Sequence, residues 1–455
     1  MRHIALVTAP VLALVLGLAL ANIGQPPEVC WTAAVTLVCA IWWIFEALPI
    51  AVTGLLPIAV FPLVGVLTPA EVGQAYGSPL ILLYLGGFML SMAMEKSGAH
   101  RRLALEMVNL FGGGERAVVF GFMVAAAMLS MWISNTATSL MLLPIALAVL
   151  EKAKDRRLKI ALLLGVAYGC NVGGIGTPIG TPPNLIFMQV YTETTGVALG
   201  FLDWMRWGIP VVIVLVPLIG FYLTRSLGHG ERLELPEVGE WRVEEKRTLI
   251  VFALTAIAWV TRSEPFGGWS GLLNLPRAND ASVALLAAVT LFLVPNGKGE
   301  RLLDWDTAAR LPWGILILFS GGICIASAFG SSGISQIIGE ALAGLSGIPT
   351  ILLFAVICLS VTFLTEITSN TATTALLMPI LAAAAIGASV DPRLLMVPAA
   401  LSASCAFMLP VATGPNAVIF ASGHVTIKDM ARAGFALNLL GAVVLTAVCY
   451  FAFVI

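Results

Sequence analysis

The sequence predicts an all-α polytopic membrane protein built from two homologous halves with opposite orientation. Three features predict this: an apolar composition, a series of long apolar stretches, and a five-residue motif that occurs twice. Of 455 residues, 59% are hydrophobic and only 11% are charged, whereas soluble domains carry roughly 25% charged residues. Helices of about 20 apolar residues span a bilayer, and we predict about eleven of them together with two re-entrant helical hairpins.

The predicted spanning helices follow the apolar stretches. They lie near 4–21, 31–48, 51–67, 79–95, 158–175, 203–225, 248–262, 281–295, 312–330, 393–410 and 433–455. The first is predicted to be a spanning helix rather than a cleaved signal peptide, because its apolar run is too long for a typical signal. Two more apolar stretches, 117–150 and 349–383, are each interrupted by small polar residues, which predicts two short helices that meet at a tip.

The distribution of Lys and Arg predicts the orientation, because basic residues concentrate in cytoplasmic loops. If the N-terminus is cytoplasmic and both hairpins return to the side they enter from, 20 of the 24 basic residues fall on the cytoplasmic side. The loops concerned contain Arg2, Lys96–Arg116, Lys152–Lys159, Arg225–Arg247, Lys298–Arg310 and Lys428–Arg432. The hairpins then enter the membrane from opposite faces.

The motif SNTAT occurs at Ser134–Thr138 and again at Ser369–Thr373. The shift that carries the first copy onto the second also places Gly86-Gly87 on Gly321-Gly322, Gly98 on Gly333 and Pro144 on Pro379. A slightly shorter shift places Thr181-Pro-Pro-Asn184 on Thr413-Gly-Pro-Asn416. Two such halves in opposite orientation form an inverted-topology repeat, an architecture typical of secondary transporters with a site at the bilayer midplane.

The repeated residues suit a binding site inside a membrane, where irregular backbone must be paired or must line a wet cavity. A hairpin tip exposes N–H groups at the start of its second helix, which favour an anion, and carbonyls at the end of its first helix, which favour a cation. One tip can therefore hold sodium beside a carboxylate. A plain helix cap or packing surface is the alternative, which two equivalent copies make less favoured. Gly86-Gly87 and Gly321-Gly322 are predicted to be helix-packing sites.

Other chemistry is scarce in the chain. The seven cysteines form no CxxC pair, the net charge of −1 argues against nucleic acid, and no motif indicates zinc, an organic cofactor or a catalytic group. We therefore predict that the protein is not an enzyme. Glu46 lies near the end of a span. Glu366, four residues before Asn370, either tunes a cation site or forms a structural pair.

These residues resemble the divalent anion:sodium symporter (DASS) family of INDY-type di- and tricarboxylate transporters. The resemblance covers essentially the whole chain and includes WWIFEALPIAVTGLLPIAVFPLVGVL at 42–67. It implies an elevator-type transporter that is a homodimer surrounded by membrane lipid. It also implies four parts: 1–112 and 227–346 as scaffold, and 113–226 and 347–455 as the transport parts that carry the two SNT hairpins.

The resemblance also implies site residues. Substrate carboxylates would meet Ser134, Asn135, Thr136, Thr181, Ser369, Asn370, Thr371 and Thr413. One sodium site would use Ser130, Ser134, Asn135 and the Gly180 carbonyl. The other would use Thr365, the Thr368 backbone carbonyl, Asn370 and the Ala412 carbonyl. The chain departs from the family at Gly414, where a proline is common.

The favoured function is sodium-coupled symport of C4-dicarboxylates such as succinate, malate and fumarate, in the inner (plasma) membrane of a cell. A sodium-independent dicarboxylate exchanger is the alternative, and citrate, tartrate or sulfate remain open as substrates. A channel is a further alternative from another class, which saturable counterflow would exclude.

Overall fold

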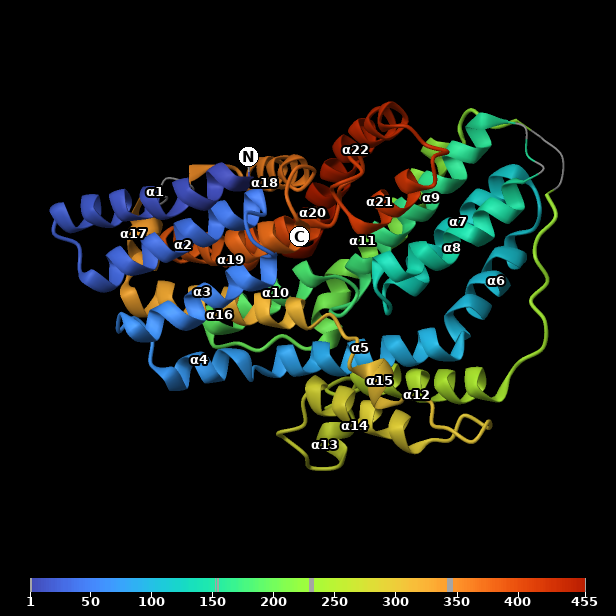
Figure 1. Ribbon diagram of the computed structural model, residues 1–455, viewed down its shortest axis with the longest axis horizontal. Coiled ribbons are helices and arrows are strands. Elements are labelled where there is room, and N and C mark those ends of the chain that lie inside the picture. The colour runs from blue at the N-terminus through green and yellow to red at the C-terminus, as the bar shows by residue number, and fades with distance from the viewer. Residues whose placement is uncertain (1, 152, 154, 229–232, 342–346, 455) are drawn as a thin grey trace.

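The computed structural model describes residues 2–151, 153, 155–228, 233–341 and 347–454 (Figure 1). Lys152, Lys154 and Arg232 of the predicted loops, and residues 1, 346 and 455 at the ends of the predicted parts, lie outside the described residues. The described residues are helical, with one isolated β-bridge between Pro295 and Arg301. The predicted all-α class is confirmed. Eight helices of the described chain are long and apolar enough to cross a membrane, so the predicted number of eleven stays a prediction.

Within the described residues, the first half of the chain forms twelve helices. They are α1 (Arg2–Asn22), α2 (Pro27–Phe45), α3 (Ile50–Leu63), α4 (Pro69–Tyr76), α5 (Pro79–Ser97), α6 (Ala99–Phe111), α7 (Glu115–Ser130), α8 (Asn135–Leu150), α9 (Arg156–Gly173), the short η1 (Gly174–Gly176), α10 (Pro182–Thr195) and α11 (Phe201–Thr224). The predicted first hairpin is α7 and α8, which meet at the SNT motif.

The second half repeats this order. Its helices in the described chain are α12 (Val243–Val260), α13 (Gly268–Leu272), α14 (Asp280–Leu293), α15 (Trp305–Ala308), α16 (Trp313–Ser332), α17 (Ile334–Ala341), α18 (Thr350–Leu364), α19 (Asn370–Gly387), α20 (Arg393–Ala403), α21 (Gly414–Ala421) and α22 (Ile427–Phe453). The predicted helix 393–410 ends at Ala403. The chain then runs without a helix to Gly414, so this segment is interrupted just as α9 and α10 are.

The two halves match in local detail as well as in order. Gly98 and Gly333 both end a long helix with a positive φ, 77° and 84°, which glycine adopts without strain. Ser134 and Ser369 both stand as N-cap residues of the second hairpin helix. The repeat predicted from the spacing of the motifs is therefore present in the structure.

Helices from the early part of each half pack against helices of the other half. A β-carbon on Gly86 of α5 would lie 2.6 Å from the β-carbon of Ala284 in α14, and one on Gly321 of α16 would lie 2.3 Å from the Gly54 carbonyl oxygen in α3. These glycines therefore let each helix approach a helix of the other half, as Figure 1 shows for α5 and α14. The prediction that they are packing sites is confirmed for Gly86 and Gly321.

Each hairpin also packs against a helix of the other half. The helix α10 of the first half packs against α19 of the second hairpin, and α21 of the second half packs against α8 of the first hairpin. Behind them, every residue of α9 from Ala161 to Gly173 is buried, as is every residue of α20 from Leu395 to Ala403. Each half therefore builds part of the surroundings of the other half's SNT motif.

Candidate functional site

Four helices begin at one cavity of about 410 Å³. They are α8, α10, α19 and α21, and their N-cap residues Ser134, Thr181, Ser369 and Thr413 all line the cavity. The side chains of Ser134, Ser369 and Thr181 do not cap their own helices. A capping hydrogen bond from the serine side chain therefore does not explain either motif.

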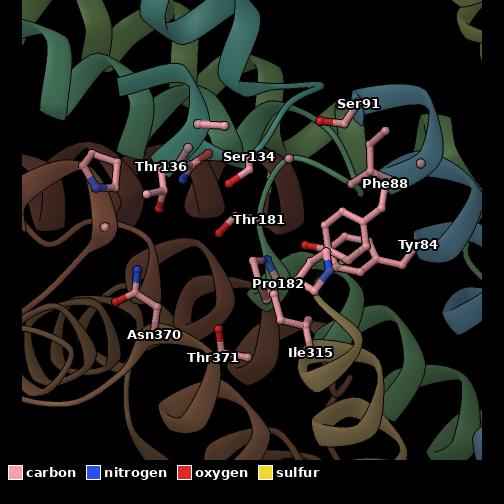
Figure 2. Close-up of a pocket in the computed structure, with 18 of the residues that line it drawn as sticks. Tyr84, Phe88, Ser91, Ser134, Thr136, Thr181, Pro182, Ile315, Asn370 and Thr371 are labelled. Carbon is pink, nitrogen blue, oxygen red and sulfur yellow. The ribbon is translucent and has the colours of Figure 1, made fainter. Parts of the chain in front are cut away.

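The predicted substrate-binding residues all lie on the wall of this cavity. Ser134, Asn135, Thr136, Thr181, Ser369, Asn370, Thr371 and Thr413 are among its lining residues. In Figure 2, Ser134, Thr136 and Thr181 surround a common space with Asn370 and Thr371. Segments from the two halves of the chain, far apart in the sequence, are thus brought together around one volume.

The predicted sodium ligands divide into two layers. Gly180 and Ala412 line the cavity together with the serine and asparagines shared with the substrate set. Ser130, Thr365 and Thr368 are buried behind the tips and do not line the cavity. These three residues therefore stand behind the cavity wall rather than on it.

The contacts between these layers are equivalent in the two halves. Ser130 Oγ donates a hydrogen bond to Asn135 Oδ1, and Thr365 Oγ1 donates to Asn370 Oδ1 at 2.6 Å. The two pairs occupy the same positions relative to their SNTAT motifs. Thr368 Oγ1 instead bonds the Leu364 carbonyl at 2.8 Å and the Thr373 hydroxyl at 2.6 Å. The side chain of Thr368 is thus occupied within its own hairpin.

The loops between the half-helices are each closed by an asparagine. Asn184 Nδ2 donates to the Gly174 carbonyl at 2.9 Å and to the Thr177 carbonyl at 2.7 Å. Asn416 Nδ2 donates to the carbonyls of Ala406 at 3.2 Å and Leu409 at 3.1 Å. These asparagines are the last residues of the repeated Thr-x-Pro-Asn motif. They satisfy buried backbone oxygens that no helix can pair.

The electrostatics of the cavity favour an anion without a basic side chain at the tips. Among the described residues, Glu95 and Arg310 are the charged residues on its wall, and neither belongs to a hairpin or an interrupted helix. The N-terminal ends of four helices supply partial positive charge and free N–H groups there. Neutral donors of this kind bind a carboxylate and still release it.

Several lining residues were missed by the sequence analysis. Tyr84, Phe88 and Ser91 of α5 and Ile315 of α16 face the hairpins across the cavity (Figure 2). Trp132, Arg310 and Gly87 also lie on the wall. These residues belong to no repeated polar motif. Which face of α5 and which face of α16 point into the cavity depends on how the two helices cross. Gly87 therefore lines the cavity as well as packing beside Ile179.

Gly414 makes a close contact that explains its departure from proline. A β-carbon at this position would lie 1.9 Å from Thr136 Oγ1. Any side chain at this position therefore requires Thr136 or the start of α21 to move. The equivalent position in the first half is Pro182, which also lines the cavity.

Glu366, whose role the sequence left open, is tied to the backbone of the second interrupted helix. Its carboxylate accepts hydrogen bonds from the N–H groups of Phe407 at 2.6 Å, Met408 at 2.9 Å and Leu409 at 3.0 Å. It also accepts one from Asn438 Nδ2 at 2.8 Å. The side chain is buried, with 3% of the residue exposed. These four hydrogen bonds hold the side chain of Glu366 in place within the fold.

Inverted repeats, paired hairpins and interrupted helices that open on one central cavity define a secondary membrane transporter. Comparison with known proteins agrees. The family model of citrate transporters, CitMHS, matches residues 40–397. The chain belongs to this family, whose members are transporters and not enzymes, and the resemblance to the divalent anion:sodium symporters is confirmed.

Curated relatives match over most of their length. A sodium-dependent dicarboxylate transporter, SdcS, of Staphylococcus saprophyticus is 42% identical over 92% of this chain and 85% of its own. SdcS of Staphylococcus aureus strain bovine RF122 / ET3-1 is 40% identical over 98% of this chain and 90% of its own.

Solved structures with the same fold are more distant in sequence. The YdaH transporter of Alcanivorax borkumensis has a TM-score of 0.61 at 17% identity, covering 87% of this chain and 88% of its own. MtrF of Neisseria gonorrhoeae, described as one of a class of antimetabolite efflux pumps, has a TM-score of 0.61 at 14% identity, covering 87% of this chain and 85% of its own. They support the fold alone.

Proposed function

We propose that the protein is a sodium-coupled symporter of C4-dicarboxylates, with succinate, malate and fumarate as its substrates. It works as a homodimer in the plasma membrane with a cytoplasmic N-terminus. Residues 113–226 and 347–455 move as the transport parts against the scaffold in an elevator-like cycle. The relatives named as sodium-dependent dicarboxylate transporters support sodium and a dicarboxylate as the transported species.

The arrangement of the two SNT tips around one cavity is the observation that carries this proposal. Each tip offers a serine hydroxyl, an asparagine amide and a helix N-terminus to the shared volume. Two such groups suit a ligand with two carboxylates, one for each tip. Arg310 lies on the cavity wall and belongs to a loop predicted to be cytoplasmic, which supports an inward-facing arrangement.

The contacts behind the tips support the two sodium sites. Thr365 Oγ1 lies 2.6 Å from Asn370 Oδ1 and 3.0 Å from the Ala403 carbonyl oxygen. Because a hydroxyl has one proton, it can donate to Ala403 and leave its own lone pairs and Asn370 Oδ1 to a cation. Sodium binding at this tip then needs a hydroxyl rotation and no movement of the backbone.

Uptake of labelled succinate into proteoliposomes tests the proposal. Vesicles without internal dicarboxylate are compared with and without an inward sodium gradient, with potassium replacing sodium as the control. Accumulation that requires sodium supports the symporter. Uptake that ignores sodium and requires internal dicarboxylate would make the protein an exchanger. Competition by citrate, tartrate and sulfate then ranks the substrates.

A further inference from the structure

The second hairpin contains a buried carboxylate that the first hairpin lacks. Glu366 follows the predicted cation ligand Thr365, and the shift that superposes the two SNTAT motifs places it on Met131, which is also buried. Every hydrogen-bond partner described for Glu366 is a donor, three of them backbone N–H groups. Its carboxylate therefore acts purely as an acceptor.

The charge of Glu366 has no basic partner. In the part of the chain that the structure describes, no Lys, Arg or His forms an ion pair or hydrogen bond with this carboxylate. Backbone and amide dipoles stabilise it locally but leave its negative charge uncompensated. A buried charge in an apolar medium acts over a longer distance than one in water, because little solvent screens it.

The cation ligands proposed at the second tip lie next to this charge in the chain and in space. Thr365 precedes Glu366, and Thr365 Oγ1 bonds the Asn370 amide oxygen. Leu409, whose N–H bonds Glu366, accepts a hydrogen bond at its carbonyl from the Ala412 N–H at 3.2 Å. Ala412 supplies the proposed carbonyl ligand. Glu366 is thus the chain neighbour of one proposed ligand and bonds the loop that leads to another.

We propose that the negative charge of Glu366 strengthens cation binding at the second hairpin tip and makes the two cation sites unequal. The inference rests on the proposed sodium coupling and adds an order of affinity between the two cation sites. The second tip, with a carboxylate behind it, binds its cation more tightly than the first tip, where Met131 stands. Glu366 does not touch the ion. It is a positioning residue that acts through its charge and through the loop from Phe407 to Ala412.

Substitution by an isosteric amide removes the charge with little change of shape, although its NH2 group replaces one oxygen that accepts from the donors around Glu366. Glu366→Gln keeps the length of the side chain and one acceptor oxygen, and it removes the charge. We expect the sodium concentration for half-maximal uptake to rise roughly tenfold, while the KM for succinate at saturating sodium stays near that of the wild-type protein. Glu151→Gln, which removes an exposed carboxylate at the end of the first hairpin, is the matched control and should change neither value.

A shorter carboxylate covers the case in which the amide variant does not fold. Glu366→Asp keeps the charge and withdraws it from the loop. If charge is what matters, its sodium dependence stays closer to the wild-type protein than to the Gln variant. If Asp and Gln behave alike, or if succinate KM rises at saturating sodium, Glu366 only shapes the loop and the proposal is overturned.

Binding without transport gives an independent readout. Sodium alone should raise the thermal midpoint of the purified wild-type protein in detergent, since a ligand that binds only the folded state stabilises it. Glu366→Gln should need roughly tenfold more sodium for the same shift. An unchanged sodium titration would overturn the proposal. A wild-type protein whose uptake and stability both ignore sodium would instead overturn the proposed symport.

Discussion

The loop after α9 and the loop after α20 occupy equivalent places, yet different chemistry holds each of them. In the first half, the helix η1 pairs part of the backbone, and neutral bonds complete the loop, including Thr177 Oγ1 to the Met131 carbonyl. In the second half, three consecutive N–H groups turn to the carboxylate of Glu366. The two halves thus keep the same backbone geometry, but different groups form the hydrogen bonds to that backbone.

The residues that line the cavity differ much less between the two halves than the residues behind them. Both tips present Ser-Asn-Thr to the cavity, and both asparagine oxygens accept from a buried hydroxyl five residues earlier. The same ligand chemistry is therefore offered twice, from supports that differ in charge and packing. Variants made in equivalent pairs show which differences matter for function.

Removing the asparagine from either tip should have the largest effect. Asn135→Ala and Asn370→Ala each delete an amide that lines the cavity and leave a buried hydroxyl without its acceptor. We expect each to reduce sodium-dependent succinate uptake by about 100-fold or more. Equal losses would indicate that both tips are required. Full activity in both variants would contradict the site assignment.

Breaking the buried ion pair on α6 should reduce stability rather than selectivity. Arg102 Nε of α6 lies 2.7 Å from Glu245 Oε2 in the first turn of α12, and both residues are buried. The matching helix of the second half, α17, has no such ion pair among the described residues. Arg102→Gln should cost about 2 kcal/mol, because Glu245 keeps its ion pair with Arg242 while the Gly239 and Glu240 carbonyls lose their charged donor.

Thermal unfolding in detergent measures this loss, and Arg101→Gln at the exposed neighbouring position is its control. A thermal midpoint of Arg102→Gln equal to that of the control would show that the pair does not hold α6 in place.

A side chain at Gly414 should weaken substrate binding. Gly414→Ala places a methyl group 1.9 Å from Thr136 Oγ1, so Thr136 or the start of α21 must move. We expect the KM for succinate to rise about tenfold, which is the usual effect of displacing one group that hydrogen-bonds a substrate. Pro182→Ala, at the equivalent place in the first half, only removes atoms and should change KM little. Equal effects would mean that the two sides of the cavity are alike.

The smallest effect is expected at the caps of α4 and α15. A hydrogen bond from Lys96, with the Thr307 backbone N–H next in size, lowers the pKa of Asp304 to about 2. Because this pKa is lower in the folded chain, the contribution to stability is present above about pH 4 and is lost as the pH falls towards 2. Asp304→Asn keeps a good cap and should flatten this pH dependence in unfolding experiments.

Asp304→Ala loses the cap as well, at a cost of about 1 kcal/mol. Thr68→Ala should cost a similar amount at α4, and part of its effect is also lost at low pH, because the hydrogen bonds from Thr68 lower the pKa of Glu71. An unchanged acid profile in Asp304→Asn would show that Asp304 is not the source of the pH dependence.

Much of the site could be predicted from sequence because its residues recur at a constant spacing. The spacing of SNTAT, Gly98 and Gly333 identified the equivalent helices, and the eight substrate residues proved to share one cavity. The helix break after Ala403 was missed, because apolar residues continue through it and the contacts that stabilise the open backbone, from Glu366 and Asn416, form only in three dimensions. Tyr84 and Phe88 were missed because lining depends on how α5 is rotated against α14.

The crossed contacts of Gly86 with Ala284 and of Gly321 with Gly54 have a consequence for biosynthesis. Gly86 leaves the ribosome long before Ala284, by roughly 10 to 40 seconds at ordinary rates of translation. Throughout that interval α5 has entered the membrane without its closest neighbour. The nascent first half must therefore persist in an open form, shielded by lipid or by the insertion machinery, until the second half arrives to complete it.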